Sequence, residues 1–259
     1  THDLNLARRL CSRIAVMKDG KVVELGETES IFQNPVEEYT KRLIEAVPSR
    51  MKRRRKSGVA ASDVEKEAGA AAADVSCMEG RKDMEGPILR VKGLRVYYKD
   101  GNNSLFARRK RQCVVEDAEF EMYPGESLGL VGESGCGKTS LSRAILGMNR
   151  EIEGEVAHTT LRPQMIFQDP YSSLNPSKTI GWLLMEPLRA RAALDKSFAM
   201  SREDMEAAAY DMLHKVGMEE KYFHRKPSQL SGGQRQRVSI GQALITNPGM
   251  IVADEPVSA

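Results

Sequence analysis

The chain has 259 residues, of which 41% are hydrophobic and 29% are charged, and its formal net charge is +3. This composition is typical of a soluble globular protein with one or two domains, and so small a net charge does not by itself indicate a nucleic-acid partner. No apolar run is long enough to cross a bilayer, and no signal peptide is recognisable. The four cysteines are scattered without CxxC spacing. Neither a zinc site nor a disulfide framework is therefore indicated, and a reducing, cytoplasmic compartment is the simple inference.

The first 50 residues contain short secondary-structure patterns but no self-contained core. The expected elements are strands over residues 14–17 and 21–25 around an Asp-Gly turn, a short helix capped by Thr28, and a helix over residues 36–46. We therefore interpret residues 1–50 as the end of a domain whose body lies elsewhere.

The composition changes over residues 51–86. A basic run at residues 50–56 is followed by a stretch rich in alanine, glycine and glutamate that contains no aromatic residue. This pattern predicts a flexible linker. The basic run could instead contact anionic lipid or RNA, but a solvated linker is the preferred interpretation.

A second domain is expected from residue 87 to the last residue. Its predicted strands cover residues 88–98, 114–122, 128–131, 165–167 and 250–253. Residues 169–229 have a helical pattern, in which Ser201 and Asp204 form a capping box and the methionines that follow are interpreted as core. A second basic cluster, residues 108–111, is interpreted as an exposed loop.

The strand predicted over residues 128–131 leads into the sequence Gly132-Glu133-Ser134-Gly135-Cys136-Gly137-Lys138-Thr139, and a helix is expected to follow. This is the pattern of a phosphate-binding loop in its required context. The glycines let backbone N–H groups converge, and the helix N-terminus adds partial positive charge. Lys138 can reach the β- and γ-phosphates of a nucleotide, and Thr139 can offer its hydroxyl to Mg²⁺.

Three further stretches make the pattern more specific. Gln168 follows a predicted strand, where it can ligate Mg²⁺ or orient water. The run Leu230-Ser231-Gly232-Gly233-Gln234 precedes a helix and provides a second phosphate-binding surface, most economically for a nucleotide held by a partner. The last predicted strand ends in Asp254, which can hold the Mg²⁺ shell, and Glu255, which can act as general base.

These motifs, in this order, resemble the ATP-binding-cassette (ABC) ATPases over residues 87–259. The resemblance implies an α/β fold, a P-loop NTPase of the ABC type with a helical subdomain at about residues 169–229, and ATP and Mg²⁺ as cofactors. The implied Mg²⁺ ligands are Thr139, Gln168 and Asp254, and the implied catalytic residues are Glu255, Gln168 and His2. The implied nucleotide contacts are Tyr98 against adenine (Tyr97 as fallback), Gly132, Glu133, Ser134, Gly135, Cys136, Gly137, Lys138, Thr139 and Ser140, with Ser231, Gly232, Gly233 and Gln234 facing the partner's nucleotide.

The resemblance can be narrowed to the oligopeptide and dipeptide importers. Residues 167–176 are similar to their Q-loop, and residues 31–35 are similar to their C-terminal tail. The run Thr1-His2-Asp3-Leu4 resembles the family's switch-histidine segment. Because several such importers fuse two cassettes, we expect residues 1–50 to be the C-terminal remnant of a first cassette. Residues 87–259 would then be a second cassette, truncated after its Asp-Glu strand.

The resemblance implies ATP hydrolysis that powers import of peptides or similar small solutes. The implied partners are a second cassette, transmembrane permease subunits and, indirectly, an extracytoplasmic solute-binding protein, with no nucleic acid expected. The implied location is peripheral, at the cytoplasmic face of the membrane. Two alternatives remain open: a soluble tandem ABC ATPase that acts on ribosomes or nucleic acid, which the two basic clusters favour, and a catalytically incomplete fragment that only binds ATP.

Overall fold

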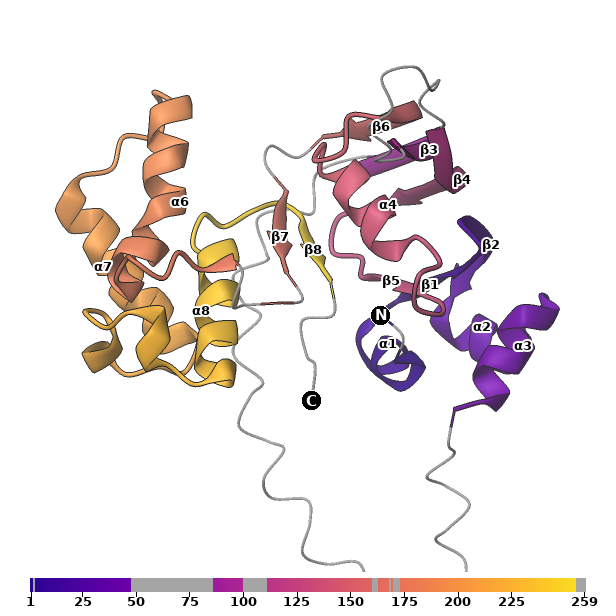
Figure 1. Cartoon of the computed structure of the whole chain (residues 1–259), viewed down its shortest axis with the longest axis horizontal. Helices are drawn as coiled ribbons and strands as arrows, with labels where there is room; N and C mark the ends of the chain where they lie inside the picture. The colour runs from indigo at the N-terminus through magenta and orange to yellow at the C-terminus, as the bar shows by residue number, and fades with distance from the viewer. Residues whose placement is uncertain are drawn as a thin grey trace, which may run out of the picture. The chain divides into compact units, whose positions relative to one another are not determined.

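The computed structural model of the chain describes residues 1, 3–47, 86–99, 111–159, 163–167, 169 and 173–254. The chain divides into two compact units. Figure 1 shows the chain coloured by residue number. The first unit comprises Thr1–Lys138 with Glu153–Ala157, and the second comprises Thr139–Ile152 with His158–Ala259. Much of the expected linker and most of the basic cluster at residues 108–111 lie outside the described residues.

One sheet of the first unit joins strands from distant parts of the sequence. Strand β1 (Arg13–Lys18) pairs antiparallel with β2 (Lys21–Glu27) and parallel with β5 (Leu128–Val131). The turn between β1 and β2 has positive φ at both of its central residues, Asp19 and Gly20. The predicted hairpin is therefore confirmed, and residues from the start of the chain lie beside the strand that leads to the phosphate-binding loop.

A second sheet of the first unit has the order β4-β3-β6. Its strands are β3 (Leu89–Lys99), β4 (Arg111–Met122) and β6 (Ile152–His158). The sequence predicted β3 and β4 but not β6. Gly154 of β6 passes so close to β3 that a Cβ there would lie 2.3 Å from the carbonyl oxygen of Gly93.

Three helices belong to the start of the chain: α1 (Leu4–Leu10), α2 (Thr28–Gln33) and α3 (Glu38–Glu45). The expectation that Thr28 caps α2 is wrong. Thr28 is the first residue of the helix, and its hydroxyl donates to the carbonyl of Cys11 at 2.6 Å. The N-cap position is held by Glu27, whose side chain makes no capping bond. A buried apolar cluster unites this segment with β5 and consists of Leu4, Ala7, Ile14, Val16, Ile31 and Val131.

The second unit contains a two-stranded parallel sheet and a group of helices. The strands are β7 (Gln164–Ile166) and β8 (Ile251–Ala253). The helices are α4 (Lys138–Ile145), whose first residue belongs to the first unit, α6 (Ile180–Leu194), α7 (Arg202–Lys215), η3 (Glu220–Tyr222), η4 (Pro227–Gln229) and α8 (Gly232–Leu244).

The predicted capping box of α7 is confirmed, because the Ser201 hydroxyl accepts from the Asp204 backbone N–H at 3.1 Å and the Asp204 carboxylate accepts in return. Met205 and Met212 of this helix are buried in one apolar cluster with residues of α6 and α8, as predicted. Among the described residues, no helix combines the length and the apolar character that a membrane span requires.

Candidate functional site: a phosphate-binding loop

Residues 132–139 connect β5 to the first turn of α4, as the sequence predicted. Glycine is required at two of these positions by close backbone approaches. A Cβ on Gly132 would lie 2.3 Å from the carbonyl oxygen of Met17, and a Cβ on Gly137 would lie 2.7 Å from that of Val114. Gly137 also has a φ of 105°, a region that other residues rarely adopt.

The ammonium group of Lys138 folds back onto the loop. Its Nζ donates to the carbonyl oxygens of Gly132 and Glu133 at 2.8 and 2.7 Å, and lies 3.8 Å from the sulfur of Cys136. Only 9% of the residue's surface is exposed. None of these three acceptors is a carboxylate, so these contacts solvate the positive charge without neutralising it. This arrangement fits an anionic ligand.

The outer part of the loop is open to solvent. Glu133, Ser134 and Gly135 are exposed, and a Cβ placed on Gly135 would meet no atom within 4 Å. A ligand could therefore approach this backbone closely, above a helix N-terminus that carries partial positive charge. The donors of the loop, the buried ammonium and the helix N-terminus together form a surface with the chemistry to bind a phosphate group.

Residues from the start of the chain also form hydrogen bonds with the loop. The backbone N–H of Gly20 donates to the carbonyl of Cys136 at 3.1 Å. The backbone N–H of Glu133 donates to the hydroxyl of Tyr39 at 3.3 Å. Sequence reasoning missed Tyr39, since nothing in its local pattern indicates a partner 94 positions away.

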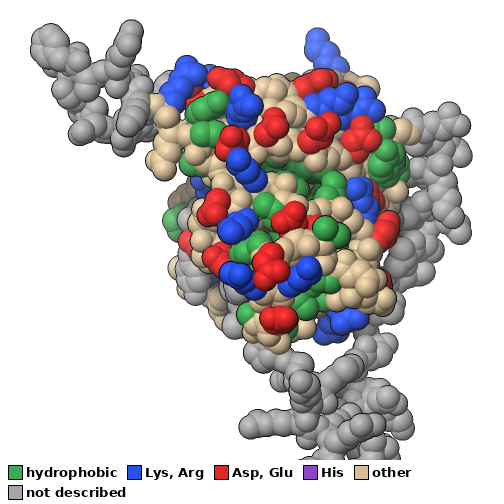
Figure 2. Space-filling model, turned by 90° about the vertical axis from the view of Figure 1, so that its right-hand side faces the viewer, with side chains coloured by type: hydrophobic (Ala, Val, Ile, Leu, Met, Phe, Trp, Pro, Cys, Tyr) green, Lys and Arg blue, Asp and Glu red, His purple; other side chains and the backbone are tan. Residues whose placement is uncertain are grey.

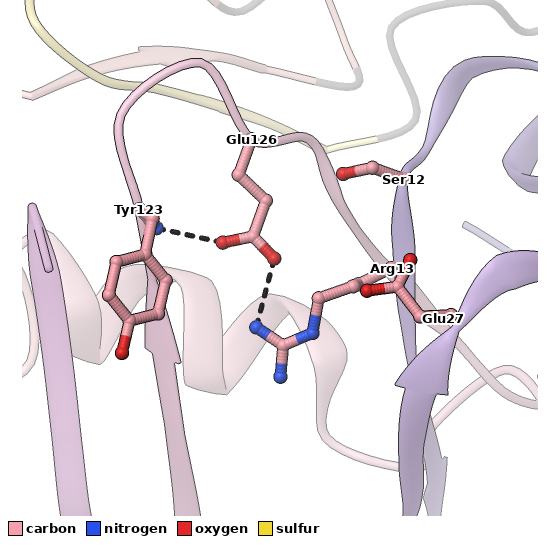
Figure 3. A pocket seen from close by; sticks show the side chains of 5 residues that line it. All are labelled: Ser12, Arg13, Glu27, Tyr123 and Glu126. Atoms are coloured by element: carbon pink, nitrogen blue, oxygen red, sulfur yellow. Dashed lines mark hydrogen bonds and ion pairs between the residues drawn. The ribbon is translucent and has the colours of Figure 1, made fainter. Parts of the chain in front are cut away.

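An open cavity of about 490 Å³ lies elsewhere in the first unit and is lined by Ser12, Arg13, Glu27, Tyr123 and Glu126 (Figure 3). Three of the lining residues already bind one another. Arg13 donates to the Glu126 carboxylate at 2.9 Å, and the same carboxylate accepts from the Tyr123 backbone N–H at 2.7 Å. We interpret these hydrogen bonds as structural contacts that join β1 to the turn preceding β5.

The tyrosines proposed to stack on adenine lie on β3. Tyr98 is 42% exposed, whereas the Tyr97 hydroxyl donates to the Glu153 carboxylate at 2.9 Å. That hydrogen bond to a carboxylate raises the pKa of Tyr97. Tyr98 is therefore accessible for stacking, and its role stays a prediction.

In the second unit, the Ser231 hydroxyl accepts from the backbone N–H of Gln234 at 3.3 Å, and the Gln234 side chain accepts from the Ser231 N–H at 2.9 Å. The predicted helix start at this motif is therefore confirmed. Gln234 also donates to the Tyr222 hydroxyl at 2.9 Å, which fixes its side chain. Ser231 and Gly233 are exposed, so the N-terminus of α8 is accessible to a ligand.

The parallel strands β7 and β8 end side by side, since the backbone N–H of Asp254 donates to the carbonyl of Ile166 at 3.0 Å. Asp254 is half-buried at this edge, where open α/β sheets bind ligands. The residues assigned to catalysis, His2, Gln168 and Glu255, lie outside the described residues. Within the described part, no group of three or more His, Cys, Asp or Glu side chains forms a metal site.

Residues 115–258 match the family model described as "ABC transporter". The chain belongs to the ABC transporter family. It is 37% identical over 281 aligned residues to a glutathione import ATP-binding protein of Salmonella choleraesuis, and 36% identical to the protein of that name from Escherichia coli strain K12. Both alignments cover 100% of this chain and 43% of the relative, so the chain spans less than half the length of these curated relatives.

The chain also resembles a solved ATP-binding cassette, MJ0796, in a dimeric post-hydrolysis state bound to ADP and phosphate. The TM-score is 0.55 at 28% identity, over 65% of this chain and 74% of that one. The fold predicted from the motifs, an α/β P-loop NTPase of the ABC ATPase type, is therefore confirmed.

The face shown in Figure 2 carries intermingled acidic and basic side chains, without an extended patch of one sign.

Proposed function

We propose that this chain binds ATP and forms part of an ATPase that powers import of peptides or similar small solutes. The observation that carries the proposal is the buried ammonium of Lys138, which lies among neutral acceptors in a glycine-rich loop at a helix N-terminus. Membership of the ABC transporter family supports the proposal that the protein hydrolyses ATP. The peptide-like import substrate named for the glutathione import relatives supports the transport role.

The loop would hold the phosphates through its N–H groups and through Lys138. Magnesium, when bound, would neutralise charge on the β- and γ-phosphates, and Thr139, Gln168 and Asp254 are the residues that would hold it. Glu255 would accept a proton from the attacking water. Tyr98 would stack on adenine. His2 would act at the γ-phosphate of the other nucleotide, the one that the Ser231 motif faces.

The second phosphate-binding surface would serve a different nucleotide. Ser231, Gly232, Gly233 and Gln234 lie at the N-terminus of α8, where backbone N–H groups attract an anion. Because one nucleotide does not need two such surfaces from a single cassette, a second cassette would supply the phosphate loop opposite this motif. The relative MJ0796 is described as a dimer, which supports such a pair.

The full alignment to the glutathione import relatives has a further consequence. Counterparts of residues 1–50 and 87–259 occur in one polypeptide in those proteins. This supports the proposal that residues 1–50 resemble the end of one cassette and residues 87–259 most of another. Permease subunits and a solute-binding protein would be the partners, at the cytoplasmic face of a membrane.

The test of nucleotide binding is Lys138→Ala. Removing the ammonium forfeits charge-assisted hydrogen bonds to phosphate, each worth about 1.5–3 kcal/mol, so the Kd for ATP should rise by at least about tenfold. Titration with a fluorescent ATP analogue measures this. The matched control is Lys215→Ala, which removes a lysine from an exposed ion pair with Asp211. Equal ATP affinities for wild type and Lys138→Ala would refute the assignment of the phosphate-binding loop.

A further inference from the structure

Three backbone positions of the phosphate-binding loop are held by residues from the first 47 of the chain. The Met17 carbonyl packs against Gly132, the Gly20 N–H donates to the Cys136 carbonyl at 3.1 Å, and the Tyr39 hydroxyl accepts from the Glu133 N–H at 3.3 Å. The first two contacts use only backbone atoms of the β1–β2 hairpin. Tyr39 is the side chain in this set, and it comes from a separate helix, α3.

Tyr39 is itself fixed in place. Its ring packs against the apolar cluster that contains Val16 and Val131, and the Nζ of Lys18 lies 5.2 Å from the ring centroid. Burial raises the pKa of Tyr39, so the hydroxyl is neutral at physiological pH. A neutral phenol in a fixed position is a suitable acceptor for a backbone N–H.

The Tyr39 contact continues directly to the lysine of the loop. Glu133 receives contacts on both of its backbone groups: its N–H donates to Tyr39, and its carbonyl accepts from Lys138 Nζ at 2.7 Å. Tyr39 therefore helps to fix the orientation of these two neighbouring peptide groups, whose carbonyl oxygens, those of Gly132 and Glu133, accept from the Lys138 ammonium. Glu133 is exposed, and among the described residues its N–H donates only to Tyr39.

We propose that Tyr39 is a positioning residue for the phosphate-binding loop, acting through the backbone of Glu133 on the Lys138 ammonium. The inference rests on the proposed binding of a nucleotide at this loop. It predicts that Tyr39 contributes to nucleotide affinity without touching the nucleotide. The physical reason is preorganisation: a loop held in its binding conformation loses less conformational freedom when a ligand arrives.

Tyr39→Phe is the test, because phenylalanine keeps the ring, its packing and its contact with Lys18 but removes the hydroxyl. We expect a Kd for ATP about 2- to 10-fold higher than wild type, the loss that follows from one neutral hydrogen bond. We also expect faster hydrogen exchange at the Glu133 amide in the protein without nucleotide, measured by NMR. The matched control is Tyr123→Phe, which removes a hydroxyl bound to the Glu121 carboxylate away from the loop.

The outcomes separate the inference from the proposed function. An ATP Kd and a Glu133 exchange rate that both match wild type in Tyr39→Phe would refute the inference alone. So would equal losses of affinity in Tyr39→Phe and Tyr123→Phe, since that result would reflect a general loss of stability. A wild-type chain that binds no ATP would refute the proposed function, and the positioning role with it.

Discussion

At the scale of single residues, the ammonium of Lys138 is an unusual group to bury. An ammonium removed from water is costly unless its donors are satisfied. Here two carbonyl oxygens and a sulfur surround the Nζ. These acceptors belong to residues 132–136, so the glycine-rich sequence supplies both the anion-binding donors and the temporary partners of the lysine. A phosphate would replace weak neutral acceptors with a charged one.

Glu255 is the residue whose substitution separates binding from chemistry. If it accepts the proton of the attacking water, Glu255→Gln should keep the ATP affinity of the assembly with a second cassette and slow hydrolysis by about 10²–10⁴. Single-turnover hydrolysis, measured beside the ATP Kd, checks both quantities. Glu219→Gln, which alters a carboxylate in an exposed contact with Lys221, is the control. Normal hydrolysis by Glu255→Gln would remove this residue from the role.

Residue roles were predictable where a local motif carries the chemistry. The spacing of Gly132, Gly137 and Lys138 is sufficient to locate a phosphate-binding loop. Tyr39 was not predictable, because its hydrogen bond to Glu133 depends on how α3 packs in three dimensions. At Thr28 a local signal was present but predicted the wrong role. A threonine before a helical pattern indicates a cap, but a carbonyl of a neighbouring segment competes for its hydroxyl.

At the scale of elements, α7 and α8 begin with the same serine capping arrangement. Ser201 and Ser231 each accept from the backbone N–H three residues on, and each helix has a reciprocal capping box. Either serine to alanine should therefore cost about 1 kcal/mol of stability. The two helices differ in their proposed role, since only the N-terminus of α8 would face a nucleotide.

This pair of helices gives a matched experiment. Ser201→Ala and Ser231→Ala should lower the denaturant midpoint by similar amounts, and only Ser231→Ala should also lower steady-state ATP hydrolysis by the assembly with a second cassette. Urea unfolding and an ATPase assay at saturating ATP measure the two effects. Equal hydrolysis rates in the two variants would show that Ser231 serves only as a cap.

Elements were predictable from sequence when their signals were local. The hairpin around Asp19 and Gly20, the strand before the loop and the cap at Ser201 all carry such signals. Strand β6 carries no such signal, because all of its residues are exposed or half-buried and its sequence lacks clear alternation. Its position depends on pairing with β3, where Gly154 permits a close approach that no local pattern reveals.

At the scale of the whole molecule, three kinds of contact join the start of the chain to β5 and to the turn that precedes it. The parallel pairing of β1 with β5 supplies backbone hydrogen bonds. Ile14 and Val16, both fully buried, pack in the same cluster as Val131. The pair between Arg13 and Glu126 is largely shielded, with side chains 23% and 10% exposed, so solvent weakens it less than a surface pair.

These contacts predict that the start of the chain stays bound when its covalent connection is cut. Burial of Ile14 and Val16 alone contributes about 1.5–3 kcal/mol each. A protease site inserted between residues 47 and 86, cleaved to completion under native conditions, should leave both pieces in one peak on size exclusion, with the ATP Kd unchanged. Val16→Glu buries an unpaired charge and should release the smaller piece, whereas Arg42→Ala, which breaks an exposed ion pair, should not. Separation of the wild-type pieces would contradict this account and would favour an independent domain boundary between them.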